Sequence, residues 1–103
     1  MNDNPFIKSL EFSNPVRAGE ENTAHLQAEW PNPGWTHIDT QITIEEKERR
    51  IIVNLRGQRG PGMSIMVIKP FQTDLEILVP DLGDWDVVVK GRAGDHIVKI
   101  TAI

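Results

Sequence analysis

Cysteine is absent from the 103 residues of this chain. Disulfides, thiolate metal ligands and a cysteine nucleophile are therefore excluded. Such a composition fits a reducing compartment, although a secreted domain without cysteine is also compatible with it. The fold has to be held by an apolar core alone, and a chain of this length is long enough to form one modest core, which predicts a single domain over residues 1–103.

Long apolar runs and an N-terminal leader are also missing. No apolar run approaches the roughly 20 residues that a membrane-spanning helix needs, and Met1–Pro5 lacks the basic and apolar regions of a signal peptide. We therefore expect no membrane span. The location is expected to be cytoplasmic if the chain is complete as given, and extracytoplasmic if a leader was removed.

Positive charge is in short supply, with 15 acidic against 11 basic residues and a net charge of −4. A mildly acidic surface repels the phosphate backbone, so nonspecific nucleic-acid binding is not expected. The expected partner is an unidentified protein, and the chain is expected to be a monomer or a weak dimer.

Helical periodicity is missing as well, and alternation with a period of two takes its place. In residues 24–30, Ala24, Leu26, Ala28 and Trp30 alternate with polar residues, which is typical of a half-buried strand. The spacing predicts seven or eight short antiparallel strands, with turn signals about every 8–12 residues. They are expected over residues 6–12, 23–30, 37–44, 51–55, 63–68, 75–79, 85–89 and 96–103. This pattern predicts an immunoglobulin-like or fibronectin-III-like β-sandwich.

Two turns in this series carry further predictions. Residues 45–50 form a run of charges, which we expect to be a solvated hairpin turn that needs no partner. Leu82-Gly83 precedes Trp85, Val87 and Val89, which share one face of a strand. This arrangement is similar to the tyrosine corner of β-sandwiches, with tryptophan in place of tyrosine. Trp85 is therefore predicted to anchor the core.

Three connections are expected to gather at one end of such a sandwich, namely residues 31–35, 70–73 and 91–95. Aromatic and arginine side chains are the usual hot spots of protein interfaces. The predicted binding residues at this end are Asn32, Pro33, Trp35, Phe71 and Arg92. The alternative for Trp35 and Phe71 is that they pack inward and seal the sandwich.

Catalytic and metal-binding patterns are weak. His37 and Asp39 would share a strand face about 7 Å apart, but a zinc site needs three or four convergent ligands. Asp84 and Asp86 flank Trp85, and a carboxylate pair for hydrolysis would also need a cleft that separates their pKa values. We therefore expect no catalytic residues, no metal and no cofactor, with a ligand site at His37 and Asp39 as the least favoured hypothesis.

Several short motifs occur in an order that resembles a known family. They are the loop at 31–36, the glycine-containing connector at 57–62, Pro70-Phe71 and the corner at 82–91. In this order they resemble the small immunoglobulin-like domains of uncharacterised bacterial envelope proteins and lipoproteins. The resemblance covers roughly residues 16–91, and it implies the fold without implying any catalytic residue.

The chain departs from this family at two positions. Family members often carry a pair of cysteines, and Trp35 and Ile65 lie near those places here. The resemblance then implies an apolar contact instead of a disulfide.

The predicted function is a non-enzymatic immunoglobulin-like module for protein interaction or structural spacing. The alternative is a protease inhibitor of the chagasin type, which would use the loops 31–35, 70–73 and 91–95. The resemblance to chagasin lies in Asn32-Pro33-Gly34-Trp35, while Arg92-Ala93-Gly94 lacks the Pro-Trp that such inhibitors carry.

Overall fold

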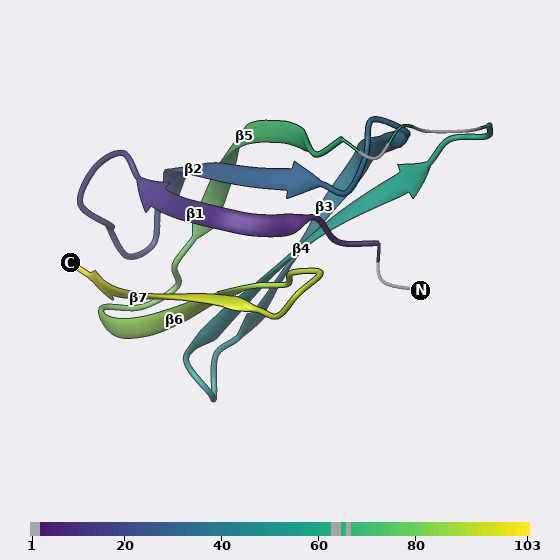
Figure 1. The fold of residues 1–103 in the computed structure, drawn as a ribbon. Coiled ribbons are helices and arrows are strands. Elements are labelled where there is room, and N and C mark those ends of the chain that lie inside the picture. Colours follow the sequence, from purple (N-terminus) through teal and green to yellow (C-terminus); the bar gives the residue numbers. More distant parts are fainter. Residues whose placement is uncertain (1–2, 63–64, 66) are drawn as a thin grey trace.

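The computed structural model describes residues 3–62, 65 and 67–103, and within these ranges the chain is all-β with seven strands and no helix. The strands are β1 (Phe6–Phe12), β2 (Glu21–Trp30), β3 (Trp35–Glu45), β4 (Arg50–Arg59), β5 (Lys69–Leu78), β6 (Gly83–Val89) and β7 (His96–Ala102). They form a three-stranded sheet in the order β1-β2-β5 and a four-stranded sheet in the order β3-β4-β6-β7. Figure 1 shows the first sheet above β6 and β7 of the second. The all-β prediction is confirmed.

The expectation of a wholly antiparallel structure is wrong for one pair of strands. Residues 50–53 of β4 run parallel to residues 86–89 of β6. A parallel pair needs a crossover connection, and here β5 provides it from the other sheet. The third strand would lie beside the sixth in an immunoglobulin constant-type sheet, whereas here the fourth strand takes that place.

The described residues of the apolar run at 63–68 do not form the strand that its composition predicts. Ile65, Val67 and Ile68 lie outside the strands and are each more than half exposed. Residues 63, 64 and 66 lie outside the described residues. The next strand begins at Lys69. An apolar run becomes a strand only where a neighbouring strand offers backbone partners, and β2 offers its partners to β5 over its whole length.

The core lies between the two sheets, and β2 shows how the sequence builds it. Ala24, Leu26, Ala28 and Trp30 are at most 3% exposed, as their alternation predicts. Each fully buried large aliphatic side chain contributes about 1.5–3 kcal/mol to folding. The four-stranded sheet supplies its inward residues from β4 and β6, namely Ile51, Val53, Leu55, Trp85, Val87 and Val89.

The corner before β6 is built around Trp85, as predicted. Trp85 is 2% exposed, and its indole N–H donates a hydrogen bond to the carbonyl of Asp81 at 3.0 Å. Gly83 takes a φ of 101°, a conformation that residues with a Cβ rarely adopt. The tryptophan therefore fixes the turn by a bond to backbone four residues upstream, as the tyrosine does in a tyrosine corner.

The charged turn between β3 and β4 has a partner, so the expectation that it needs none is wrong for Arg49. Its guanidinium carbon lies 4.6 Å above the centre of the Trp85 ring. Its Nε donates to the carbonyl of Asp84 at 3.0 Å, and its Nη2 donates to the carbonyl of Leu82. The backbone N–H of Asp86 in turn donates to the Arg49 carbonyl at 3.0 Å. These contacts fasten the end of the β3–β4 hairpin to the β5–β6 corner.

The described part of the molecule is elongated, with extents of 48 × 25 × 19 Å. The β3–β4 hairpin crosses the molecule diagonally, and its turn projects beyond β6 at the bottom of Figure 1. Within the described ranges, no helix is long and apolar enough to cross a membrane. The projecting hairpin leaves β3 as the outermost strand of its sheet.

Candidate interaction surface

The structure brings three of the predicted binding residues into one cluster, but two of them face inward. Trp35 is 4% exposed, and its ring is parallel to that of Trp30 with 5.8 Å between the ring centres. The Arg92 guanidinium carbon lies 4.6 Å from the centre of the Trp35 ring. Phe71 is half-buried, 5.9 Å from Trp30 between ring centres. The predicted hot-spot aromatics therefore pack against the core side of the sheets.

Arg92 is held in this cluster from several sides. Its backbone N–H donates to the carbonyl of Pro5 at 2.9 Å. Its Nε and Nη2 atoms are buried and have no hydrogen-bond partner among the residues that the structure describes. Burying each unpaired donor costs about 1–3 kcal/mol, and a desolvated cation–π contact of about 2 kcal/mol offsets part of the cost of the two. Arg92 thus caps Trp35 and does not present a fully accessible guanidinium.

Asn32 and Pro33 lie in the short turn between β2 and β3. The Asn32 side-chain oxygen accepts a bond from Gly34 N–H at 3.0 Å, and its carbonyl accepts one from Trp35 N–H at 3.3 Å. Residues 70–73 were predicted as a loop, and they lie instead inside β5, paired with residues 26–29 of β2. The predicted three-loop end therefore consists of two turns and a strand.

The His37–Asp39 hypothesis fails on geometry, because the two residues do not share a face. The β3–β4 register shifts between them. His37 turns to the inner side, where its ring lies 5.0 Å from that of Phe71. Asp39 pairs with Arg56 on the outer side, through Nε at 2.8 Å and through Nη2. The guanidinium holds the pKa of Asp39 below its ordinary value.

Two further titratable side chains, His25 and Asp84, are engaged in local contacts. His25 Nδ1 lies 2.8 Å from a carboxylate oxygen of Asp74 on the outer face of the three-stranded sheet, and this bond raises the pKa of His25. Asp84 accepts a bond from the Thr101 hydroxyl at 2.7 Å. Among the described residues, no three His, Cys, Asp or Glu side chains converge as metal ligands.

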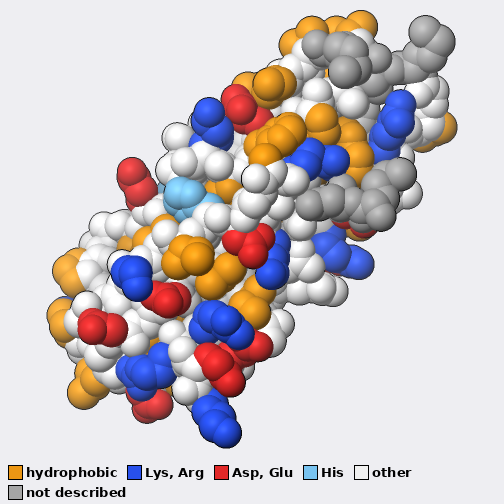
Figure 2. All heavy atoms as spheres, turned by 60° about the horizontal axis from the view of Figure 1, so that its bottom comes forward, with side chains coloured by type: hydrophobic (Ala, Val, Ile, Leu, Met, Phe, Trp, Pro, Cys, Tyr) orange, Lys and Arg blue, Asp and Glu red, His pale blue; other side chains and the backbone are white. Residues whose placement is uncertain are grey.

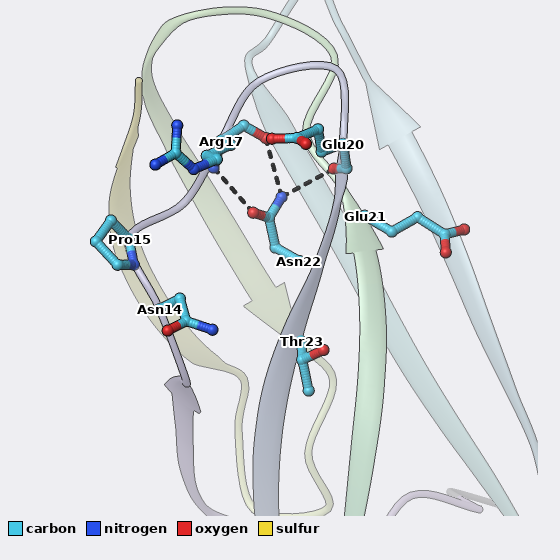
Figure 3. Close-up of a pocket in the computed structure, with 7 residues that line it drawn as sticks. All are labelled: Asn14, Pro15, Arg17, Glu20, Glu21, Asn22 and Thr23. Atoms are coloured by element: carbon cyan, nitrogen blue, oxygen red, sulfur yellow. Dashed lines mark hydrogen bonds between the residues drawn. The ribbon is translucent and has the colours of Figure 1, made fainter.

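Two hollows of the described surface are open clefts. One of about 490 Å³ lies between β1 and the β6–β7 hairpin, and its lining includes Phe6, Lys8 and His96. Another of about 340 Å³ lies at the β1–β2 turn (Figure 3). The Asn22 side chain in this second cleft bonds to the N–H and carbonyl of Arg17 and to the carbonyl of Glu20. Its polar atoms are used in holding the turn, so this cleft offers little to a ligand.

The outer face of the four-stranded sheet carries charges of both signs. Figure 2 shows acidic and basic side chains interspersed with small hydrophobic areas on this side. Arg50 bonds to Glu45 at 2.6 Å, and Lys99 lies 3.6 Å from Asp86. Because these charges neutralise one another in pairs, the face provides no field of one sign for a charged partner.

The outer edge of β3 differs from these surfaces because it exposes backbone groups. The backbone N–H of Lys90 donates to the Val53 carbonyl, so the N–H and C=O groups of Val53 point toward β6. The backbone groups of the two residues on either side of Val53 therefore point toward β3. The residues of β3 opposite those neighbours include Gln41 and Thr43. By the alternation of a strand, the N–H and C=O groups of residues 40, 42 and 44 point away from β4. No described strand pairs with them.

Only part of this edge is open. At the start of β3, Lys69 Nζ donates to the Trp35 carbonyl at 3.0 Å, and the register shift follows between His37 and Asp39. Beyond it lies Thr40-Gln41-Ile42-Thr43-Ile44, a β-prone stretch without charge or proline. Ile42 is 38% exposed. We call residues 40–44 the open edge of β3.

The other three sheet edges carry features that discourage strand pairing. The β1 edge has a register shift at Lys8. The β5 edge contains Pro70, Asp74 and Glu76, and the β7 edge has Lys99 at its centre. Bulges, proline and charged side chains are the usual means by which proteins protect exposed edges. The open edge of β3 lacks all of them.

The open edge is not marked by aromatic or charged side chains, which are the usual sequence signals of a binding site, because what it exposes is backbone groups. The uncharged, β-branched character of residues 40–44 was visible in the sequence, but the position of β3 at the edge was not. Comparisons of the chain with protein-family models, with curated proteins and with solved structures found no match.

Proposed function

We propose that this protein is a non-enzymatic protein-interaction module, and that it binds an extended segment of a partner as an added strand along the open edge of β3. The observation that carries the proposal is the row of backbone groups at residues 40, 42 and 44 that point away from β4 and that no strand in the described part of the chain pairs with. In strand addition, main-chain hydrogen bonds supply affinity and alternate side chains supply selectivity.

The side chains around the open edge favour an uncharged strand. Ile42 and Ile44 lie on the inner side of β3, opposite Val53 and Ile51 of β4. The flanking carboxylates, Asp39 and Glu45, are already paired with arginines of β4. A partner strand with β-branched or aromatic residues at alternate positions would extend the apolar row without opposing a charge.

The proposal of a non-enzymatic role is supported by the way in which polar and charged side chains are used. The imidazole of His25 and the carboxylate of Asp39 are each engaged by one neighbouring side chain. The Arg92 donors are buried against Trp35. A nucleophile and base within hydrogen-bond reach of each other in a cleft would be required for hydrolysis.

The immunoglobulin-like fold and the relation to bacterial envelope domains belong to the same proposal. The three-stranded sheet of the first, second and fifth strands and the Trp85 corner support it. The parallel β4–β6 pair is a departure from that topology. The domain would then serve as a scaffold that presents its β3 edge.

The chagasin-type inhibitor has less support from the geometry. Residues 70–73 lie in β5, and Trp35 is buried, so two of the three contact segments are committed to the fold. Inhibition of papain at micromolar protein would favour this alternative over the strand-addition proposal.

A random linear peptide library panned against the protein tests strand addition. We expect the enriched peptides to be free of proline and rich in β-branched residues, and to shift the amide resonances of residues 40–44. The variant Ile42→Lys places a charge on the open edge, and it should lose these peptides while keeping its fold, because the replaced side chain is already 38% exposed. Peptides that bind this variant as well as the wild type would contradict the proposal.

A further inference from the structure

We propose that the open edge of β3 also pairs with a second copy of this chain, in a two-fold symmetric dimer that joins two four-stranded sheets into one continuous sheet. This inference rests on the proposed function, since it uses the same edge. It goes further by naming an occupant, and the argument for that occupant is that residues 40–44 are complementary to themselves.

The complementarity begins with the backbone. An antiparallel pair with its two-fold axis at Ile42 places Ile42 opposite its own copy and Thr40 opposite Ile44 of the second chain. These are the residues whose N–H and C=O groups point away from β4. Each outward group of residues 40–44 then meets a partner, and none is left over. A symmetric interface of this kind is the commonest one in soluble homo-oligomers.

The side chains agree with this register. On the inner side, Ile42 would contact its own copy, and Ile44 would lie against the methyl group of Thr40. On the outer side, Gln41 would lie opposite Thr43, two groups that can hydrogen-bond to each other. The pairing keeps the inner faces of both copies on one side of the joined sheet, because directly opposed residues of an antiparallel pair share a face.

Neighbouring registers are less favourable. An axis at Gln41 draws the register shift between His37 and Asp39 into the interface. An axis at Thr43 leaves the outward groups of Thr40 without a strand partner, because they would meet the turn that follows β3. An axis between two residues sets an isoleucine from the inner face opposite a polar residue from the outer face.

The register at Ile42 has one unfavourable contact, and removing that contact provides a test of the register. Asp39 would face Glu45 of the second copy, and like charges directly opposite each other weaken strand pairing. Arg56 and Arg50 partly neutralise these two carboxylates within each chain. Replacing Glu45 by Gln should therefore strengthen the dimer, an effect that an edge used only by a foreign strand would not produce.

Sedimentation velocity over a wide concentration range tests the proposal. The wild type should rise from 11.6 kDa toward twice that mass. Ile42→Lys should weaken the association by about tenfold or more, and Glu45→Gln should shift the midpoint to lower concentration. Ile97→Lys is the matched control, since it places the same charge on the exposed Ile97 of the β7 edge and should leave the association unchanged.

Two outcomes would overturn the dimer. One is a wild type that stays at 11.6 kDa up to millimolar concentration. The other is equal weakening by Ile42→Lys and by Ile97→Lys. In either case, peptides from the library that still require an intact Ile42 would keep the strand-addition proposal and remove only the second copy as its occupant. A dimer that forms while no peptide is enriched would keep the second copy as the occupant of the edge and remove the foreign strand.

Discussion

Replacing Gly57 by Ala is the perturbation with the sharpest expected result. Gly57 lies in the second half of β4, buried against the six-membered ring of Trp30, which is 0% exposed. A Cβ on residue 57 would come within 2.6 Å of Trp30 Cζ3 and closer still to Cη2. Carbon atoms in good contact lie about 3.5–4.0 Å apart, so the indole ring would have to retreat by roughly an ångström.

Two effects of this substitution oppose each other, and their magnitudes decide the sign. Replacing glycine by alanine inside a strand removes conformational entropy from the unfolded chain, which favours folding by roughly 0.5–1 kcal/mol. Overpacking a well-packed core costs about 1–3 kcal/mol. Trp30 cannot retreat freely, because Trp35 is stacked on it and Arg92 lies over Trp35. We therefore expect a net loss of roughly 1–2 kcal/mol.

Urea unfolding followed by tryptophan fluorescence measures this loss, and each kcal/mol should lower Tm by about 4–8 °C in a domain of this size. Gly60→Ala is the matched control, because its Cβ would meet only the Gly34 carbonyl at 3.4 Å. It should be neutral or slightly stabilising. In a double-mutant cycle, Trp30→Phe should cost less in the Gly57→Ala background than alone. If Gly57→Ala proved as stable as the wild type, the packing argument would be refuted.

Three further predictions concern charged groups. Arg49→Ala should lower the free energy of unfolding by roughly 1 kcal/mol, because the bonds to the β5–β6 corner are lost; an unchanged urea midpoint would show that the hairpin holds without them. Asp74→Asn should lower the pKa of His25 toward its ordinary value, as measured by NMR titration of the imidazole. In the wild type, the stabilisation by the His25–Asp74 pair should be fully present below the pKa that His25 has in the unfolded chain. It should be lost as pH rises through the raised pKa that His25 has in the folded protein. Arg56→Gln should raise the pKa of Asp39, which NMR titration of the carboxyl group measures. In the wild type, the Asp39–Arg56 pair should stabilise the fold fully above the pKa that Asp39 has in the unfolded chain. Acid unfolding should show this stabilisation being lost as pH falls through the lowered pKa of Asp39 in the folded protein.

The parts of the fold that sequence could predict are those decided within a single strand or turn. The alternation of Ala24 to Trp30 depends on one strand having one buried face, so local pattern was sufficient. The burial of Trp85 follows from a glycine turn that leads an aromatic into a β-prone strand. Neither conclusion needs the identity of the neighbouring strand.

The parts that sequence could not predict depend on neighbours distant along the chain. The shift between His37 and Asp39 changes the face of every later residue of β3 by a single step, and nothing in the local pattern marks it. The parallel pairing of β4 with β6 is a choice between edges that offer similar backbone groups. The candidate site shares this origin, because residues 40–44 become an open edge only when β3 is outermost in its sheet.

The path of the chain between the two sheets has a consequence for unfolding. After β4 the chain leaves the four-stranded sheet, contributes β5 to the other, and returns as β6 to lie beside β4. Because the two layers also share one core, we expect neither layer to melt while the other stays intact. We expect calorimetric and van't Hoff enthalpies to agree, with both layers lost in one cooperative event.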